Sequence, residues 1–68
     1  MIEEILHQLA VFVLHNRDVL IVTVLVRGEV DGRTIRVLEN RFPMAEFEFA
    51  AVPSWEATLV SIRRREEN

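Results

Sequence analysis

The longest apolar run of the chain lies between Asp18 and Arg27, where Thr23 is the only polar residue. A run so rich in β-branched valine and isoleucine predicts a strand over residues 19–30. Because successive side chains of a strand point to opposite faces of the sheet, both faces of this strand would be apolar. The pattern therefore predicts that other parts of the protein, or a partner, bury both faces of this strand.

The N-terminal segment has the spacing of an amphipathic helix over residues 2–14. Glu3 and Glu4 fall in its first turn, where the helix dipole favours carboxylates. The alternative is a strand over residues 10–14, since the β-branched and aromatic residues there also suit a sheet. The apolar positions that carry the helical pattern are Ile2, Ile5, Leu6, Leu9 and Val13.

A β-hairpin is predicted after the long strand. Asp31 and Gly32 form a dipeptide that tolerates positive φ at both central positions of a type I′ turn. Residues 33–39 would then return as a second strand, with Val26 opposite Val37. In the same register Arg27 would face Arg36, with Glu29 placed diagonally to offset the like charges.

The C-terminal half holds one clear strand and one ambiguous segment. Over residues 45–52, Glu46 and Glu48 alternate with phenylalanines, which is typical of a half-buried strand. Residues 54–67 fit a helix capped by Ser54, but Thr58, Val60 and Ile62 also alternate as in a strand. We favour the strand.

These elements predict an α+β fold, in which the N-terminal helix packs on a three- or four-stranded antiparallel sheet in one small two-layer domain over residues 1–68. One helix covers one face of the sheet and leaves the other open. A second copy of the chain or another protein is expected there, unless the last segment folds over as a second helix. The predicted oligomer interface is Leu20, Val22, Val24 and Val26, or the alternate set of the same strand.

Length and composition also favour assembly. A chain of 68 residues builds a small core, and small domains are usually reinforced by disulfides, a structural metal or oligomerisation. The chain has no cysteine, so we expect a homo-oligomer, most simply a twofold dimer. The net charge of -3 is modest, and neither a secretory signal nor a membrane span is recognisable, so a cytoplasmic protein without membrane contact is expected.

The sequence points to no catalytic, cofactor-binding or metal-binding residues. Glu3 and His7 stand four apart on the predicted helix, which favours a surface ion pair over a metal site because no third ligand is in view. Glu46 and Glu48 could in principle act as paired carboxylates, yet their alternation with phenylalanine is what any amphipathic strand shows. No cofactor is expected.

The main functional hypothesis is a small non-enzymatic regulatory protein, such as an inhibitor or adaptor of a bacterium or its phage, that binds another protein. Its expected contact residues are Arg27, Arg36, Glu46, Glu48 and Trp55. The alternative is a nucleic-acid-binding oligomer whose copies gather Arg27, Arg36 and Arg63–Arg65 on one face. A third interpretation is an enzyme whose site is assembled between subunits.

Overall fold

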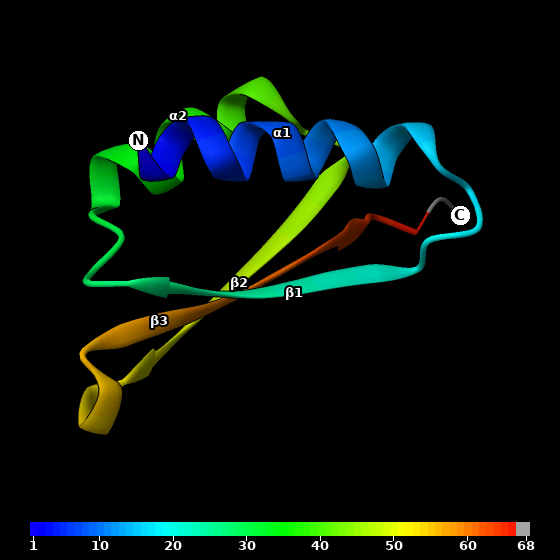
Figure 1. Cartoon of the computed structure of the whole chain (residues 1–68). Coiled ribbons are helices and arrows are strands. Elements are labelled where there is room, and N and C mark those ends of the chain that lie inside the picture. The colour runs from blue at the N-terminus through cyan, green and yellow to red at the C-terminus, as the bar shows by residue number, and fades with distance from the viewer. Residues whose placement is uncertain (67–68) are drawn as a thin grey trace.

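The computed structural model describes residues 1–66 and confirms the α+β class and the antiparallel sheet. The chain forms two helices and three strands, and the last two strands follow one another through a short turn (Figure 1). Within the described residues, no helix is both long and apolar enough to cross a membrane. The elements are α1 (Ile2–His15), β1 (Ile21–Arg27), α2 (Gly32–Arg41), β2 (Ala45–Val52), the short 3-10 turn η1 (Pro53–Trp55) and β3 (Ala57–Arg64).

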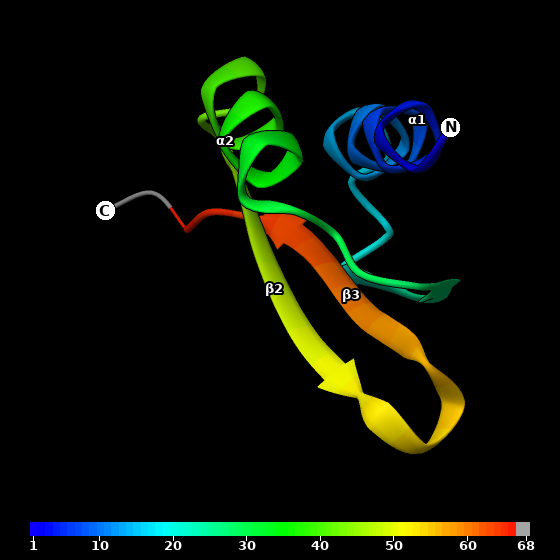
Figure 2. The same ribbon diagram turned by 90° about the vertical axis from the view of Figure 1, so that its left-hand side faces the viewer.

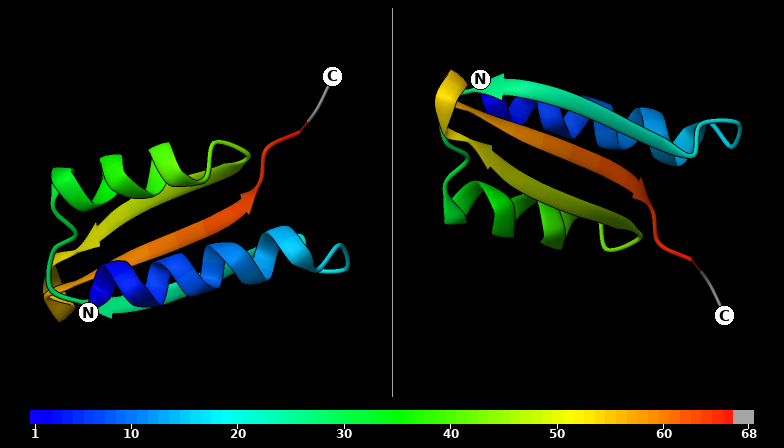
Figure 3. Two further views of the ribbon diagram at one scale, coloured as in Figure 1. Left: turned by 90° about the horizontal axis from the view of Figure 1, so that it is seen from above. Right: turned by 90° about the horizontal axis from the view of Figure 1, so that it is seen from below.

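The sheet has the order β1-β3-β2, and the central strand β3 is antiparallel to both neighbours. Both helices lie on the same face of the sheet, with α1 on the β1 side and α2 on the β2 side (Figures 2 and 3). The molecule is thus two-layered: helices form one layer, and the sheet forms the other.

The predicted helix at the N-terminus is confirmed, and it ends one residue later than expected, at His15. Its buried face is Leu6, Ala10 and Val13, which recur every three or four residues. The carbonyls at its C-terminal end have no partner within the helix. The Arg64 guanidinium on β3 supplies one, donating to the carbonyls of Val13, Asn16 (3.1 Å) and Arg17 (3.0 Å).

The predicted hairpin at residues 31–32 is wrong, because a helix, α2, begins there. Asp31 is its N-cap: a carboxylate oxygen accepts a hydrogen bond from the backbone N–H of Thr34 at 2.8 Å. This bond holds the pKa of Asp31 below its ordinary value, with a smaller contribution from the Thr34 side chain. Gly32 does not adopt the positive φ that a type I′ turn would require.

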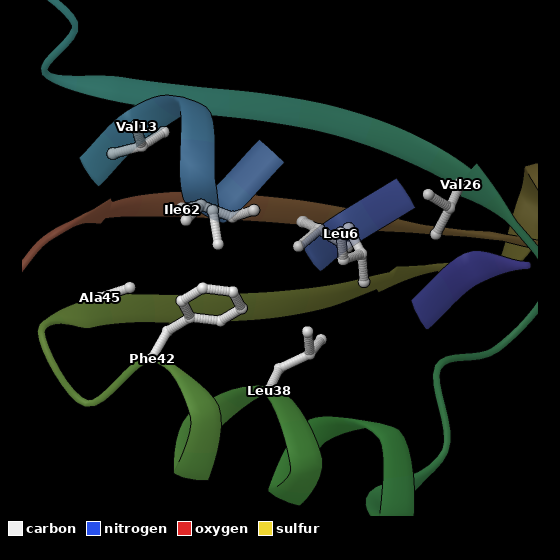
Figure 4. Close-up of a cluster of buried hydrophobic side chains, with 9 residues drawn as sticks. Leu6, Val13, Val26, Leu38, Phe42, Ala45 and Ile62 are labelled. Atoms are coloured by element: carbon white, nitrogen blue, oxygen red, sulfur yellow. The ribbon is translucent and has the colours of Figure 1, made fainter. Parts of the chain in front are cut away.

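The core lies between the two layers (Figure 4). Leu38 of α2 and Phe42, which follows α2 directly, lie in one cluster with Ile62 of β3 and with Leu6 and Val13 of α1. The largest fully buried side chains are Leu6, Val13, Leu38, Val60 and Ile62. The helix that replaces the predicted return strand therefore supplies part of the core.

The ambiguous C-terminal segment forms the strand β3 from Ala57 to Arg64, as favoured; Glu67, at the end of that segment, lies outside the described residues. Before β3, the turn η1 begins at Pro53 and leads to Glu56 in the left-handed conformation (φ 48°). This end of the sheet curves away from the helical layer (Figures 1 and 2), and Trp55, within η1, is largely exposed.

Candidate protein-interaction surface

The sheet face opposite the helices has no cover among the residues that the structure describes. We call it the open face. Its members follow from the alternation of side chains along each strand, because most residues that face the helices are buried or half-buried. The open face consists of Ile21, Thr23, Leu25 and Arg27 from β1, Ala57, Leu59, Ser61 and Arg63 from β3, and Glu46, Glu48, Ala50 and Val52 from β2.

One half of the open face is apolar. The strand register places Leu25 opposite Leu59, and Leu59 opposite Ala50. In the next row Arg27, Ala57 and Val52 lie side by side. Leu25 remains 44% exposed even though it lies within a β-strand. Cross-strand neighbours of this kind form a continuous apolar surface rather than isolated exposed side chains.

Trp55 borders the apolar half and is 67% exposed. Together with Leu25, Arg27 and Ala57 it lines a shallow hollow where β1 meets the η1 turn. The hollow thus combines two large apolar side chains with one guanidinium. Arg27 forms no ion pair with any carboxylate of the described residues. Its charge is therefore available to a ligand.

The other half of the open face is charged but internally paired. The Nε of Arg63 lies 2.7 Å from Oε1 of Glu46, and its Nη2 lies 4.0 Å from Oε2 of Glu48. Arg65 reaches the second oxygen of Glu46 at 3.9 Å. The hydrogen bond to Glu46 raises the pKa of Arg63 above its ordinary value. Because these charges satisfy one another, this half offers no separate acidic patch.

Between the two halves, the hydroxyls of Thr23 and Ser61 lie 3.3 Å apart. The histidines lie elsewhere: the ring of His7 packs edge-on against Phe42 at a centroid distance of 4.9 Å, rather than pairing with Glu3. Nδ1 of His15 lies 2.9 Å from the carbonyl of Val11. Among residues 1–66, no three His, Asp or Glu side chains are grouped so as to hold a metal ion.

The structure separates several residues that the sequence grouped. Arg27 and Arg36 do not face each other, because residue 36 lies on α2 and residue 27 on the open face. Of the predicted partner-binding residues, only Arg27 and Trp55 line the same hollow. Glu46 and Glu48 share the open face but pair with Arg63, which the sequence analysis had assigned to a basic cluster.

The residues predicted to form the oligomer interface do not lie together on the open face. Val26 is buried, and Val22 and Val24 pack against the core beneath the helices, so this set is not the uncovered face. Leu20 lies in the connection before β1 and is largely exposed. The alternate set of the same strand forms the open face, because both helices lie on the valine side.

Two arginine roles escaped the sequence analysis. Arg64 caps the C-terminal end of α1, and Arg63 pairs across the sheet with Glu46. Alternation within "IRRR" would have placed residues 63 and 64 on opposite faces of a strand, which was the available signal. Comparison with family models, with curated proteins and with solved structures finds no significant match to this chain.

Proposed function

We propose that the protein is a small non-enzymatic interaction protein that binds another protein through the open face, with the hollow of Leu25, Arg27 and Trp55 as its anchor point. The observation that supports this proposal most is the hollow itself: a largely exposed tryptophan beside an arginine without an ion pair among the described residues. Because such a protein would act only by binding to the surface of its partner, it would serve as an inhibitor or an adaptor.

The residue types favour a protein as the ligand. Tryptophan and arginine are the side chains most enriched at the energetic centres of protein interfaces, where neighbouring apolar contacts exclude water from them. Here Leu59, Ala50 and Val52 provide such neighbours on the adjacent strands. A flat apolar strip with one anchoring hollow is therefore suited to a folded surface or an extended peptide.

The hollow also indicates the chemistry of the partner. Leu25 and Trp55 offer an apolar wall, and Arg27 offers donors that match a carboxylate bidentately. We therefore propose a partner segment that presents an apolar side chain directly beside an aspartate, a glutamate or a terminal carboxylate. Charge complementarity of this kind fixes the register of binding and speeds encounter.

Nucleic acid is less well supported. Arg63 and Arg65 contact Glu46, and Arg64 is committed to the carbonyls at the end of α1. Of the remaining arginines, Arg17 lies in the connection between α1 and β1, Arg27 lies on the open face, and the others lie on α2. A nucleic-acid site would normally gather them into one basic face with stacking aromatics.

The proposal can be tested without a known partner by selecting from a random peptide library displayed on phage. We expect enriched peptides to carry an apolar residue next to an acidic one. Trp55→Ala and Arg27→Ala should each weaken binding of a selected peptide by about tenfold or more, since truncating an anchor residue of an interface has effects of this size. Arg36→Ala is the matched control, because it removes an arginine on α2 and should leave binding unchanged.

Two results would contradict the proposal. One is selected peptides that bind equally well to the Trp55 and Arg27 variants. The other is tight binding of labelled DNA or RNA that weakens steeply with salt, which would favour the nucleic-acid alternative. Circular dichroism of each variant ensures that lost binding is not lost folding.

A further inference from the structure

The outer edge of β1 carries backbone groups that no strand of the described chain uses, because β1 is an edge strand of the sheet. The backbone N–H of Gly28 donates to the carbonyl of Glu56, which fixes the alternation of hydrogen bonds in this antiparallel pair. Even-numbered residues of β1 therefore bond to β3. The N–H and C=O groups of Ile21, Thr23, Leu25 and Arg27 point outwards from the sheet.

This edge has few of the features that usually prevent strands from pairing between molecules. Natural edge strands are blocked by proline, by charged side chains, by bulges or by covering segments. Over its seven residues β1 contains no proline, and Arg27, its only charge, stands at the last position. The other edge, β2, is flanked by Pro43 and Pro53 and carries two glutamates.

An apolar stripe of α1 lies on the same side of the molecule. Each helical residue turns about 100° from the last, so Ile5, Leu9 and Phe12 occupy the flank opposite His7. His7 faces α2 through Phe42. The stripe therefore faces away from α2 and lies along the β1 side of the helical layer (Figure 2). Ile5 and Phe12 are 50% and 47% exposed.

We propose that this surface binds a second copy of the chain, in a twofold dimer in which the two β1 strands pair antiparallel about Val24. In this register, backbone hydrogen bonds pair Ile21 with Arg27 of the second copy and Thr23 with Leu25 of the second copy. All the outward backbone groups of β1 then find partners, whereas a shift by two residues leaves some of them unpaired. The two helical layers stay on the same side of a continuous six-stranded sheet.

The side chains are complementary in the same register. Val22, Val24 and Val26 meet the same valines of the second copy in the close, non-hydrogen-bonded pairs of the ladder. Arg27 lies opposite Ile21, so no like charges are opposed. The helices become antiparallel neighbours, and Ile5 of one lies towards the end that carries Phe12 of the other. The dimer uses the outer edge of β1 and the flank of α1, whereas the proposed partner binds over the open face, so this inference does not rest on the proposed function.

Sedimentation equilibrium tests the dimer. We expect a dimer mass at micromolar concentration, and Phe12→Lys should raise its dissociation constant by about tenfold or more, because the symmetric contact loses apolar area twice. Met44→Lys is the matched control: Met44 is 46% exposed but lies in the α2–β2 connection, and its replacement should leave the dimer intact.

Disulfide formation between engineered cysteines tests the register of the two β1 strands directly. The natural chain contains no cysteine that could interfere. Residues of a hydrogen-bonded antiparallel pair have Cα atoms about 5.5 Å apart, within the range of about 4.4–6.8 Å that a disulfide spans. The double variant Thr23→Cys with Leu25→Cys should therefore form a covalent dimer on oxidation, and neither single variant should do so.

A monomer mass at high concentration would overturn the inference, as would crosslinking by a single variant, which would show a shifted register. Dissociation by Leu59→Lys but not by Phe12→Lys would show that copies stack through their open faces instead. Failure of the proposed function is distinguishable, because peptide binding by the hollow can be lost while the dimer mass is unchanged.

Discussion

Replacing Gly32 by alanine distinguishes the helix α2 from the hairpin that the Asp31-Gly32 dipeptide suggested. In the structure Gly32 is the first residue of α2 and does not have positive φ. A methyl group there would meet only the end of the Arg36 side chain, at 3.8 Å. Alanine also reduces the conformational freedom of the unfolded chain, which stabilises a protein by about 0.4–1 kcal/mol at compatible positions.

The expected result of Gly32→Ala is therefore a more stable protein. For domains of this size, 1 kcal/mol corresponds to about 4–8 °C in melting temperature, so the melting temperature should rise by about 2–8 °C. The measurement is thermal unfolding followed by circular dichroism, with both proteins at the same concentration because the proposed dimer would make melting concentration-dependent.

Gly28→Ala is the matched control. Gly28 has φ 87°, and an added Cβ would meet nothing within 4 Å, so only backbone strain opposes the substitution. A left-handed conformation costs a non-glycine residue about 1–2 kcal/mol, and the melting temperature should fall. If Gly32→Ala destabilises the protein as Gly28→Ala does, residue 32 has positive φ and the assignment of α2 is refuted.

Two further predictions concern Asp31 and the two faces of β1. Because the pKa of Asp31 is lowered in the folded state, the stabilisation by its carboxylate is present above the ordinary carboxyl pKa of 3.8 and is lost as the pH falls through the lowered value. Asp31→Asn keeps an oxygen for the Thr34 N–H but does not titrate, so the free energy of unfolding in urea should fall less at acidic pH than it does for the natural chain. An equal fall in both proteins would contradict the role of Asp31 as a charged N-cap. Val24→Glu should destabilise the fold by at least about 2 kcal/mol in denaturant titration, because it puts a carboxylate beneath α1, whereas Leu25→Glu should cost about 1 kcal/mol or less and abolish peptide binding; equal costs would mean that the strand faces are wrongly assigned.

The fold class could be predicted because the hydrophobic spacing in three segments was consistent with only a few structures. The helical spacing of Leu6 and Val13 and the alternation of Glu46 and Glu48 are both present in the structure. The helix α2 was missed because Asp31-Gly32 is compatible with two local structures, since aspartate is favoured both as the N-cap of a helix and as a turn residue. The separation of Leu38 and Phe42 by four residues was a helical signal in the same segment.

The location of the site was harder to predict for a related reason. Both faces of β1 are apolar, so its sequence alone does not say which face the helices cover. That choice depends on where α2 packs, and α2 was predicted as a strand. The contribution of Trp55 to the hollow depends likewise on the turn η1, which brings it beside Arg27 although 28 positions separate them in the sequence.

The two apolar faces of β1 have different physical explanations. Its valines lie beneath α1 and, in the proposed dimer, continue into the valines of the second copy. Its alternate residues, Leu25 and Arg27, lie on the open face beside Trp55. Because strand side chains alternate while the backbone groups point sideways, one strand can complete the core, join two copies and contact a partner at once. In the dimer both hollows would lie on the same side of one continuous sheet, so a partner with two matching segments would bind with the added strength of a bivalent contact.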